Sequence, residues 1–283
     1  MTRAARVVAC LRNNQEVSIV TYEFIKLERA NLIGTLTFNR PAKLNAMNAA
    51  MLAEFERAIA EATDDPSIRV LIIRGAGRAF SSGYDLDRNT GDQTIDRDRE
   101  YLQANLQRWL ALRDFPKPVI AMVHGYCLAG ATQLCICADV TFVADDAVVG
   151  FPSVPAGAGF IGQSWAWVVG MHRAKYLSFL PGSQISGSQA ALWGWATLSI
   201  PMERLEQETY SYASRIAKVP SELLRIKKLS INRVADIQGF RTAFLLGAEW
   251  DAIARATSGV QEVRAMIKEK GLRGAIDWFS KNG

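Results

Sequence analysis

PVIAMVHGYCLAGATQLCICADVTFVA, residues 118–144, contains a strand pattern, a glycine-containing loop, a helix pattern and a second strand pattern in succession. Aliphatic and β-branched residues dominate 118–123 and 140–144, which predicts two buried strands. The segment from about Ala131 to Ala138 predicts a short helix between them. A helix that connects two buried strands is typical of a parallel sheet, so this stretch predicts an α/β fold.

The chain upstream has the same mixture of strands and helices. Two segments rich in strand formers flank the turn-like RANL and predict a hairpin. Asn48 is a candidate N-cap for the helical spacing that follows it. The elements expected here are strands Tyr22–Glu28, Ile33–Asn39 and 70–74, a helix from Asn48 and a helix near 97–113.

The character of the sequence changes after Ser186, beyond which the patterned segments all predict helices. We therefore expect an N-terminal extension over residues 1–19, an α/β core over 20–200 and a helical C-terminal region over 201–283.

Composition and charge narrow the functional classes. The chain has 283 residues, of which 49% are hydrophobic and 22% charged, and its net charge of 33 − 28 = +5 is mild. Lys and Arg form no block interleaved with aromatics, so we expect no nucleic acid partner. The apolar runs are too short for a membrane span. The basic N-terminus lacks the apolar core of a signal peptide, so we expect a cytoplasmic protein.

Metal and dinucleotide sites are not indicated. Cys10, Cys127, Cys135 and Cys137 lie in no CxxC pattern, so we expect buried small residues and no metal. GAGFIG (157–162) matches GxGxxG, but no strand pattern precedes it and no acidic residue follows at the required spacing. His124, at a strand end, has no visible acidic partner, which favours a structural role.

Two glycine-containing loops, FSSGYDL (80–86) and HGYCLAGA (124–131), each lie between a strand pattern and a helix pattern. Glycine allows the backbone to turn sharply and to approach a ligand closely. The second loop enters a helix near Gly130, where N–H groups lack intrahelical partners. Two such N–H groups could hold a carbonyl oxygen that becomes negative, as an oxyanion hole does. The residues alone do not decide between an oxyanion hole and two loops that only connect a strand to a helix.

Five stretches of the chain resemble the crotonase superfamily, the enoyl-CoA hydratase/isomerase family, over about residues 20–270. The resemblance implies a spiral of ββα units with a C-terminal helical region, a homo-trimer or hexamer, and an acyl-CoA thioester as ligand, with coenzyme A as part of the substrate and no other cofactor. The stretches are NRPAKLNAMN (39–48), VLIIRGAGRAFSSGYDL (70–86), KPVIAMVHGYCLAGATQLCICADVTFVADDAVVGFP (117–152), VVGMHRAKYLSFLPGSQISGSQAALWGWA (168–196) and IAKVPSELLRIKKLSIN (216–232).

The resemblance also implies roles for particular residues. The backbone N–H groups of Tyr84 and Gly130 match the two oxyanion donors. The positions that match the coenzyme A site are Lys43, Leu44 and Ala46 on the adenine side, with Ser82, Asp85, Leu86 and Asp87 along the ligand. Many relatives carry a lysine in place of Asp87, which shifts the expected phosphate contact to Arg88 or elsewhere. A loop-stabilising role for Asp85 stays open beside ligand contact.

The pair of glutamates with which hydratases of this family position and split water is replaced here. The first position, three residues after the oxyanion glycine, holds Gln133, and the second holds Ser153 in GFPS. A glutamine side chain forms hydrogen bonds but transfers no proton at neutral pH. The half of the site that stabilises an enolate is therefore expected to be present, and the usual proton-transferring half is not.

Three functions remain open. The first is a crotonase-type lyase or isomerase of fatty acid metabolism that acts on an unusual acyl-CoA and is not a standard hydratase, with proton transfer by another residue or by the substrate itself. Tyr84, Asp87, His124 and Tyr126 are the conceivable proton carriers in that case. The second is an acyl-CoA-binding protein without catalysis, and the third is a structural partner in an assembly.

Overall fold

A hairpin begins the part of the chain that the computed structural model describes, namely residues 22–85, 94–152, 155 and 161–282. Strand β1 (Ile25–Ala30) pairs antiparallel with β2 (Ile33–Phe38). Asn31 and Leu32 between them have φ angles of 53° and 66°, and positive values at both positions are typical of the tight turns that match strand twist. The predicted hairpin is confirmed, although its first strand begins at Ile25.

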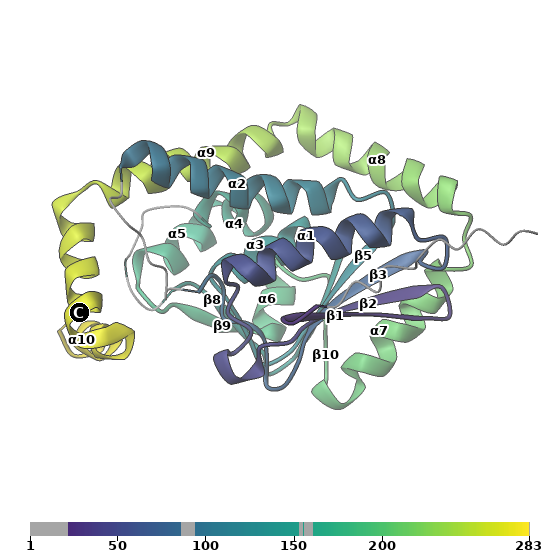
Figure 1. Cartoon of the computed structure of the whole chain (residues 1–283), viewed down its shortest axis with the longest axis horizontal. Coiled ribbons are helices and arrows are strands. Elements are labelled where there is room, and N and C mark those ends of the chain that lie inside the picture. The colour runs from purple at the N-terminus through teal and green to yellow at the C-terminus, as the bar shows by residue number, and fades with distance from the viewer. Residues whose placement is uncertain (1–21, 86–93, 153–154, 156–160, 283) are drawn as a thin grey trace, which may run out of the picture.

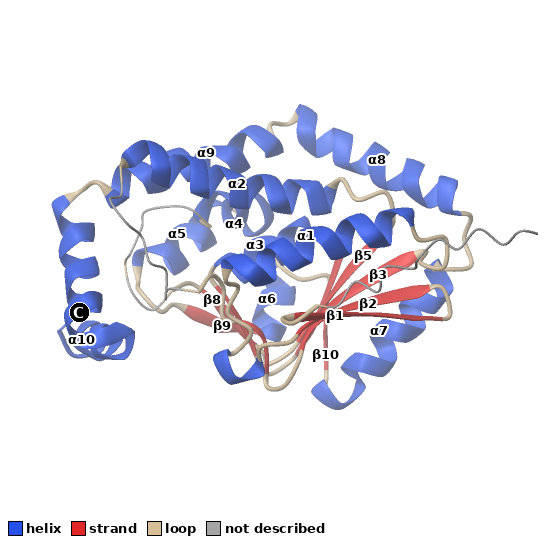
Figure 2. Ribbon diagram, in the orientation of Figure 1, coloured by secondary structure: helices blue, strands red, loops and turns tan. Residues whose placement is uncertain are grey.

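The described strands form two sheets (Figures 1 and 2). The larger sheet has six strands in the order β1-β2-β3-β5-β7-β10, and the smaller has four in the order β4-β6-β8-β9. The strands after the hairpin are β3 (Val70–Gly75), β4 (Ala79–Ser81), β5 (Val119–Val123), β6 (Tyr126–Leu128), β7 (Val140–Ala144), β8 (Val148–Gly150), β9 (Gln184–Ser186) and β10 (Leu198–Ile200).

From β3 to β8, consecutive strands alternate between the two sheets. β3, β5 and β7 lie in the larger sheet, and β4, β6 and β8, which follow them directly, lie in the smaller one. At least one helix follows each of these strand pairs, so the chain winds as the expected spiral of ββα units. The strands of the smaller sheet have three residues each, too few to show a periodicity. β4 and β6 overlap the two segments that were predicted to be loops, and no element was predicted for β8 or β9.

Helices cover both faces of the larger sheet. α1 packs on β1 and β2, while α7 packs on β3, β5 and β7, and Figure 1 shows these two helices above and below the strands. α9 lies along α2. The helices are η1 (Pro41–Lys43), α1 (Ala49–Asp64), α2 (Ile95–Arg113), α3 (Gly130–Cys137), α4 (Gly162–Val169), α5 (Met171–Phe179), α6 (Gly187–Trp193), α7 (Met202–Ile216), α8 (Ser221–Ile237), α9 (Phe240–Arg255) and α10 (Ser258–Asn282).

Local signals in the sequence account for several helix ends. The Asn48 side chain accepts a hydrogen bond from the Met51 N–H at 2.8 Å, which confirms the predicted N-cap of α1. α4 was not predicted, because apolar residues occupy most positions of QSWAWVV and leave no helical periodicity, and α5 was not predicted either. Gly170, with φ 82°, separates these two helices.

Burial on both faces explains the unbroken apolar runs. Every residue of β5 is buried, as is every residue of β3 except Arg74. Strands of a parallel sheet covered on both faces read as continuous aliphatic stretches rather than as alternating ones. No helix within the described residues combines the length and the apolarity that a bilayer crossing requires. The division of the chain into three regions stays a prediction.

Candidate active site

Two neighbouring strands bring the two glycine-containing loops together. β4 and β6 are parallel neighbours in the smaller sheet, so the loops that follow them leave from the same edge. A Cβ atom built on Gly83 would lie 2.8 Å from the carbonyl oxygen of Leu128 and 3.2 Å from the backbone nitrogen of Gly130. Gly83 also has a φ of 95°. Position 83 therefore requires glycine for its backbone angle and for the contact between the loops.

The first loop fixes the direction of the Tyr84 N–H. The carbonyl of Gly83 accepts a hydrogen bond from the Met47 N–H at 2.8 Å, and the Asp85 N–H donates to the Met47 carbonyl at 3.0 Å. The Gly83 carbonyl and the Tyr84 N–H belong to one planar trans peptide and point in opposite directions. Because Met47 holds the carbonyl end of this peptide, the N–H end is directed away from Met47.

The second loop fixes the Gly130 N–H in the same way. The carbonyl of Ala129 accepts hydrogen bonds from the N–H of Thr132 at 3.0 Å and from its hydroxyl at 2.7 Å. The Thr132 hydroxyl in turn accepts the indole N–H of Trp165 at 2.9 Å. Ala129 has φ 50° and ψ −125°, a conformation that is costly for a residue with a side chain. These contacts hold the Ala129–Gly130 peptide with its N–H directed away from Thr132.

Gly130 is the first residue of α3 and is buried. An N–H at this position has no partner within its own helix, and it lies at the positive end of the helix dipole. Two fixed backbone donors on touching loops, one of them at a helix N-terminus, form an arrangement that suits a carbonyl oxygen gaining negative charge.

The Tyr84 side chain extends from this site toward α2. Its hydroxyl accepts the indole N–H of Trp109 at 2.7 Å, and Trp109 is fully buried. Burial raises the pKa of the Tyr84 hydroxyl well above its usual range, with a smaller opposing effect from the Trp109 hydrogen bond. The phenol is therefore neutral at physiological pH and is a poor proton donor to a reacting carbon.

The described residues among those predicted to contact coenzyme A lie on two segments that are in contact, PAKLNA and the loop of Tyr84. The Ser82 N–H donates to the Leu44 carbonyl at 2.9 Å, and the Ala46 N–H donates to the Lys43 carbonyl at 3.0 Å. Lys43 is exposed, whereas Leu44, Ala46 and Ser82 are half-buried. The structure thus brings the PAKLNA segment against the loop of Tyr84. Leu86, Asp87 and Arg88 lie outside the described residues.

The Asn45 side chain joins the PAKLNA segment to the chain before the Tyr84 loop by hydrogen bonds. Its side-chain amide donates to the carbonyls of Ala76 and Ala79 at 2.9 and 2.7 Å, and its Oδ1 accepts the Arg40 N–H at 2.9 Å. Asn45 is fully buried and has φ 54°, a left-handed conformation that asparagine tolerates better than most residues. The sequence analysis missed this residue, although Asn within the turn-like PAKLNA was an available signal.

Asp85 contacts a cation of the protein itself. Its Oδ2 lies 2.8 Å from Nη1 of Arg40, which also donates to the Ala46 carbonyl at 2.5 Å. The two side chains are 14% and 17% exposed. This arrangement favours the loop-stabilising role over direct ligand contact.

Asp85→Asn is expected to lower the free energy of unfolding by about 1.5–3 kcal/mol, because hydrogen bonds to charged groups typically contribute that much. Chemical denaturation of Asp85→Asn, Arg40→Gln and the double variant gives the coupling energy. We expect a coupling of about 1 kcal/mol and a small change in affinity for a coenzyme A ester. A coupling near zero, with a large loss of affinity, would favour ligand contact instead.

Of the two positions that the resemblance matches to the glutamates of hydratases, the structure describes only position 133. Gln133 lies one turn after Gly130 on α3 and is fully buried, so its amide is close to the second donor along the helix. Ser153 lies outside the described residues.

His124 and the three described cysteines are buried, and His124 contacts a backbone carbonyl. The His124 ring Nε2 lies 2.8 Å from the Gly77 carbonyl, and the side chain is buried. Cys127, Cys135 and Cys137 are buried and free, as predicted, and burial raises the pKa of both the Cys135 and the Cys137 thiols. Among the described residues, no three His, Cys, Asp or Glu side chains gather as a metal site requires. Cys10 lies outside these residues.

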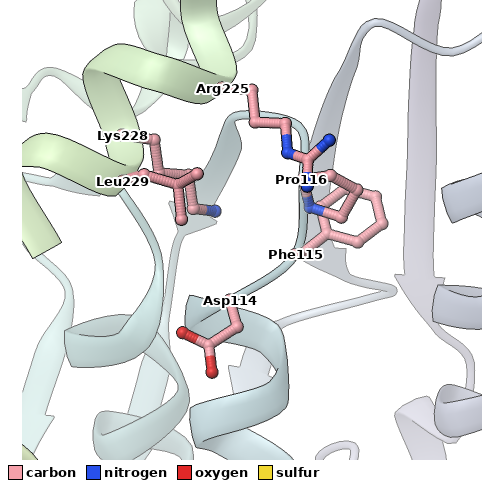
Figure 3. Close-up of a pocket in the computed structure, with 6 residues that line it drawn as sticks. All are labelled: Asp114, Phe115, Pro116, Arg225, Lys228 and Leu229. Carbon is pink, nitrogen blue, oxygen red and sulfur yellow. The ribbon is translucent and has the colours of Figure 1, made fainter.

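A cavity of about 230 Å³ lies near the amino end of β5, between the turn after α2 and the helix α8 (Figure 3). Lys228 on its wall donates to Asp139 at 2.7 Å and to the Lys117 carbonyl at 3.2 Å. The two donor loops instead follow β4 and β6, so this cavity is not part of the site that they form. The lining residues are Asp114, Phe115, Pro116, Arg225, Lys228 and Leu229.

Trp109 and Thr132 are, like Asn45, contributors to the site that were not predicted from the sequence. Trp109 is one of many apolar residues on a helix, and nothing in the spacing indicates contact with Tyr84. Thr132 follows the predicted donor by two residues, and a threonine in the first turn of a helix often bonds locally to the backbone.

Comparisons with known proteins identify the family of the chain. The family model described as enoyl-CoA hydratase/isomerase matches residues 28–271. EchA13 of Mycobacterium tuberculosis, described as a candidate enoyl-CoA hydratase, is 32% identical in an alignment of 260 positions that covers 82% of this chain and 79% of that protein.

Two crystal structures match over most of their length. A candidate enoyl-CoA hydratase/isomerase from Novosphingobium aromaticivorans is 36% identical, with a TM-score of 0.88 over 91% of this chain and 95% of that one. An enoyl-CoA hydratase/isomerase from Xanthobacter autotrophicus is 30% identical, with a TM-score of 0.87 over 93% and 99% of the chains. The protein therefore belongs to the enoyl-CoA hydratase/isomerase family of the crotonase superfamily, as its sequence motifs predicted.

Proposed function

We propose that this protein binds an acyl-CoA thioester and stabilises its enolate with the backbone N–H groups of Tyr84 and Gly130. The contact between the two loops carries the proposal, because Gly83 touches the backbone at Gly130 and each donor peptide is held at its carbonyl end. Donors fixed before the substrate arrives need no reorganisation when charge develops on the oxygen. The family as a whole acts on coenzyme A thioesters.

The chemistry follows from the position of the charge. When a bond to the α-carbon of the acyl group breaks, its electron pair delocalises onto the thioester oxygen and an enolate forms. The two N–H groups and the amino end of α3 stabilise that negative oxygen. The electron pair returns to carbon when a new bond forms there. Isomerisation, C–C cleavage or decarboxylation fit this site better than hydration, because an enolate can form without a positioned water.

A neutral amide at position 133 also favours a second function. Gln133 is fully buried where the family's hydratases have a glutamate, and an amide neither accepts nor releases a proton at neutral pH. A protein that holds an acyl-CoA without converting it needs no more than the donors and the coenzyme A contacts. The candidate is therefore an acyl-CoA-binding protein without catalysis.

Other features of the proposed enzyme remain expectations. We expect a homo-trimer or hexamer that works in the cytoplasm, with coenzyme A only as part of the substrate. The apolar side chains exposed on α8 support an oligomer, since an isolated helix face of this kind is usually covered. These side chains are Leu223, Ile226, Leu229, Ile231, Val234 and Ile237.

A panel of acyl-CoA thioesters tests the proposal. We expect calorimetry to show micromolar binding of at least one ester, together with turnover of a branched, β-keto or malonyl-type thioester followed by mass spectrometry. Binding without any turnover favours the non-catalytic alternative. Absence of binding across the panel contradicts both functions and leaves a structural role in an assembly.

A further inference from the structure

The Tyr84 ring lies directly on the helix terminus that holds the second donor. A Cβ atom built on Gly130 would lie 2.2 Å from Cε2, 2.4 Å from Cδ2 and 2.9 Å from Cζ of Tyr84. Distances this short leave no room for a methyl group, so the edge of the ring is in van der Waals contact with the Gly130 Cα. The ring fills the space in front of the first turn of α3.

The ring is held in place at its far end. Its hydroxyl accepts the Trp109 indole N–H at 2.7 Å, and the two ring centroids are 6.5 Å apart. Trp109 packs edge to face on Phe55, with centroids 5.5 Å apart, and both are buried in the core. A side chain anchored in this way moves with the core, so the Tyr84 ring is a fixed wall and not a swinging gate.

This wall is adjacent to the thioester in the proposed complex. A carbonyl oxygen bonded to the Gly130 N–H lies about 2.9 Å from that nitrogen. The Tyr84 ring touches the Cα next to the same nitrogen, and the first carbons of the acyl group must therefore lie near the ring. The Tyr84 N–H would donate to the thioester oxygen, and the Tyr84 ring would contact the first carbons of the acyl group.

We infer that the Tyr84 side chain determines specificity by limiting the acyl group on the α2 side to short or flat groups, an inference that rests on the proposed function. A flexible saturated chain would require the volume that the ring occupies. A short acyl chain, or a planar unsaturated or aromatic one, can instead lie against the ring, and aromatic pairs gain additional free energy from stacked or edge-on contact. The wall thus filters acyl groups by shape without taking part in bond breaking.

Calorimetry with acetyl-CoA, octanoyl-CoA, benzoyl-CoA and free coenzyme A tests this role. We compare the full-length wild type with Tyr84→Ala and with the matched control Tyr84→Phe, which keeps the ring and removes only the hydroxyl. The ratio of octanoyl-CoA to acetyl-CoA affinity should rise about tenfold or more in Tyr84→Ala, which corresponds to burying about two further methylene groups. The ratio should stay close to wild type in Tyr84→Phe, and benzoyl-CoA should lose affinity only in Tyr84→Ala.

The outcomes separate this inference from the proposed function. If the wild type binds neither free coenzyme A nor any ester, both are overturned. If it binds them, and Tyr84→Ala leaves the octanoyl-to-acetyl ratio unchanged, only the role of the Tyr84 side chain is overturned. Tyr84→Leu provides a second test if circular dichroism shows that Tyr84→Ala does not fold, and a smaller rise in the same ratio is then expected.

Discussion

Crotonyl-CoA mixed with this protein is expected to keep its conjugated thioester absorbance, because Gln133 and Ser153 stand at the positions that the sequence resemblance matches to the two glutamates of hydratases. Adding water across the double bond requires a base to polarise the water and an acid to deliver a proton to the α-carbon. Each well-placed group of this kind typically contributes about 10²–10⁴-fold. Without both, the rate should fall by the product of the two factors, even with both oxyanion donors in place.

The assay follows the decrease in thioester absorbance with the unmodified protein. A family member that carries both glutamates is the positive control, and denatured protein is the blank. Turnover at about 1–10³ s⁻¹, which is typical of enzymes, would contradict the prediction and reveal an acid–base pair elsewhere. It would also show that the correspondence of Ser153 to the second glutamate is wrong.

Adding the carboxylates back refines the same test. Gln133→Glu together with Ser153→Glu is expected to produce a trace of hydratase activity, and Gln133→Glu alone serves as the control that should stay inactive. Position 133 is fully buried, so burial would raise the pKa of a glutamate there and favour its protonated form. That state suits the acid of the pair, whereas the base must come from position 153.

Long segments of the fold could be predicted because they have a clear physical signal. The buried strands β3 and β5 are long aliphatic runs, and Asn48 marks the start of α1 by the hydrogen bond that it accepts. The four strands of the smaller sheet have no such signal at three residues each. Their pairing comes from the winding of the whole chain, and the sequence resemblance, not periodicity, indicated it.

The site, too, could be predicted only in part from the sequence. Glycine at positions 83 and 130 indicated loops that approach something closely, but spacing alone did not show that Gly83 touches the backbone at Gly130. Side-chain contacts between distant segments were not predicted. The Tyr84–Trp109 hydrogen bond and the Arg40–Asp85 ion pair each join residues that are far apart in the chain, and they depend on tertiary packing.

Gly130→Pro should damage thioester recognition by removing the second donor N–H. Removing one donor of an oxyanion hole typically costs about 3–4 kcal/mol in the transition state, or roughly 10²–10³-fold in turnover. A neutral carbonyl gains only about 0.5–1.5 kcal/mol from one hydrogen bond, so the affinity for the unreacted thioester should fall by about tenfold at most. Free coenzyme A has no such carbonyl, and its affinity should change little.

Gly130→Pro also adds atoms where the structure has no room, so it must be compared with a variant that adds a side chain but keeps the N–H. Any side chain at position 130 places Cβ 2.2 Å from the Tyr84 ring, so proline and alanine there collide with the ring alike. Gly130→Ala keeps the N–H and is therefore the matched control, best made with Tyr84→Ala, which clears the space in both proteins. Proline is tolerated at the first position of a helix, but it restricts Ala129, whose φ is already 50°, so circular dichroism must confirm the fold. A thioester-specific loss in Gly130→Pro relative to Gly130→Ala is then attributable to the missing N–H. Equal affinities and equal turnover in the two proteins would show that Gly130 is not a donor.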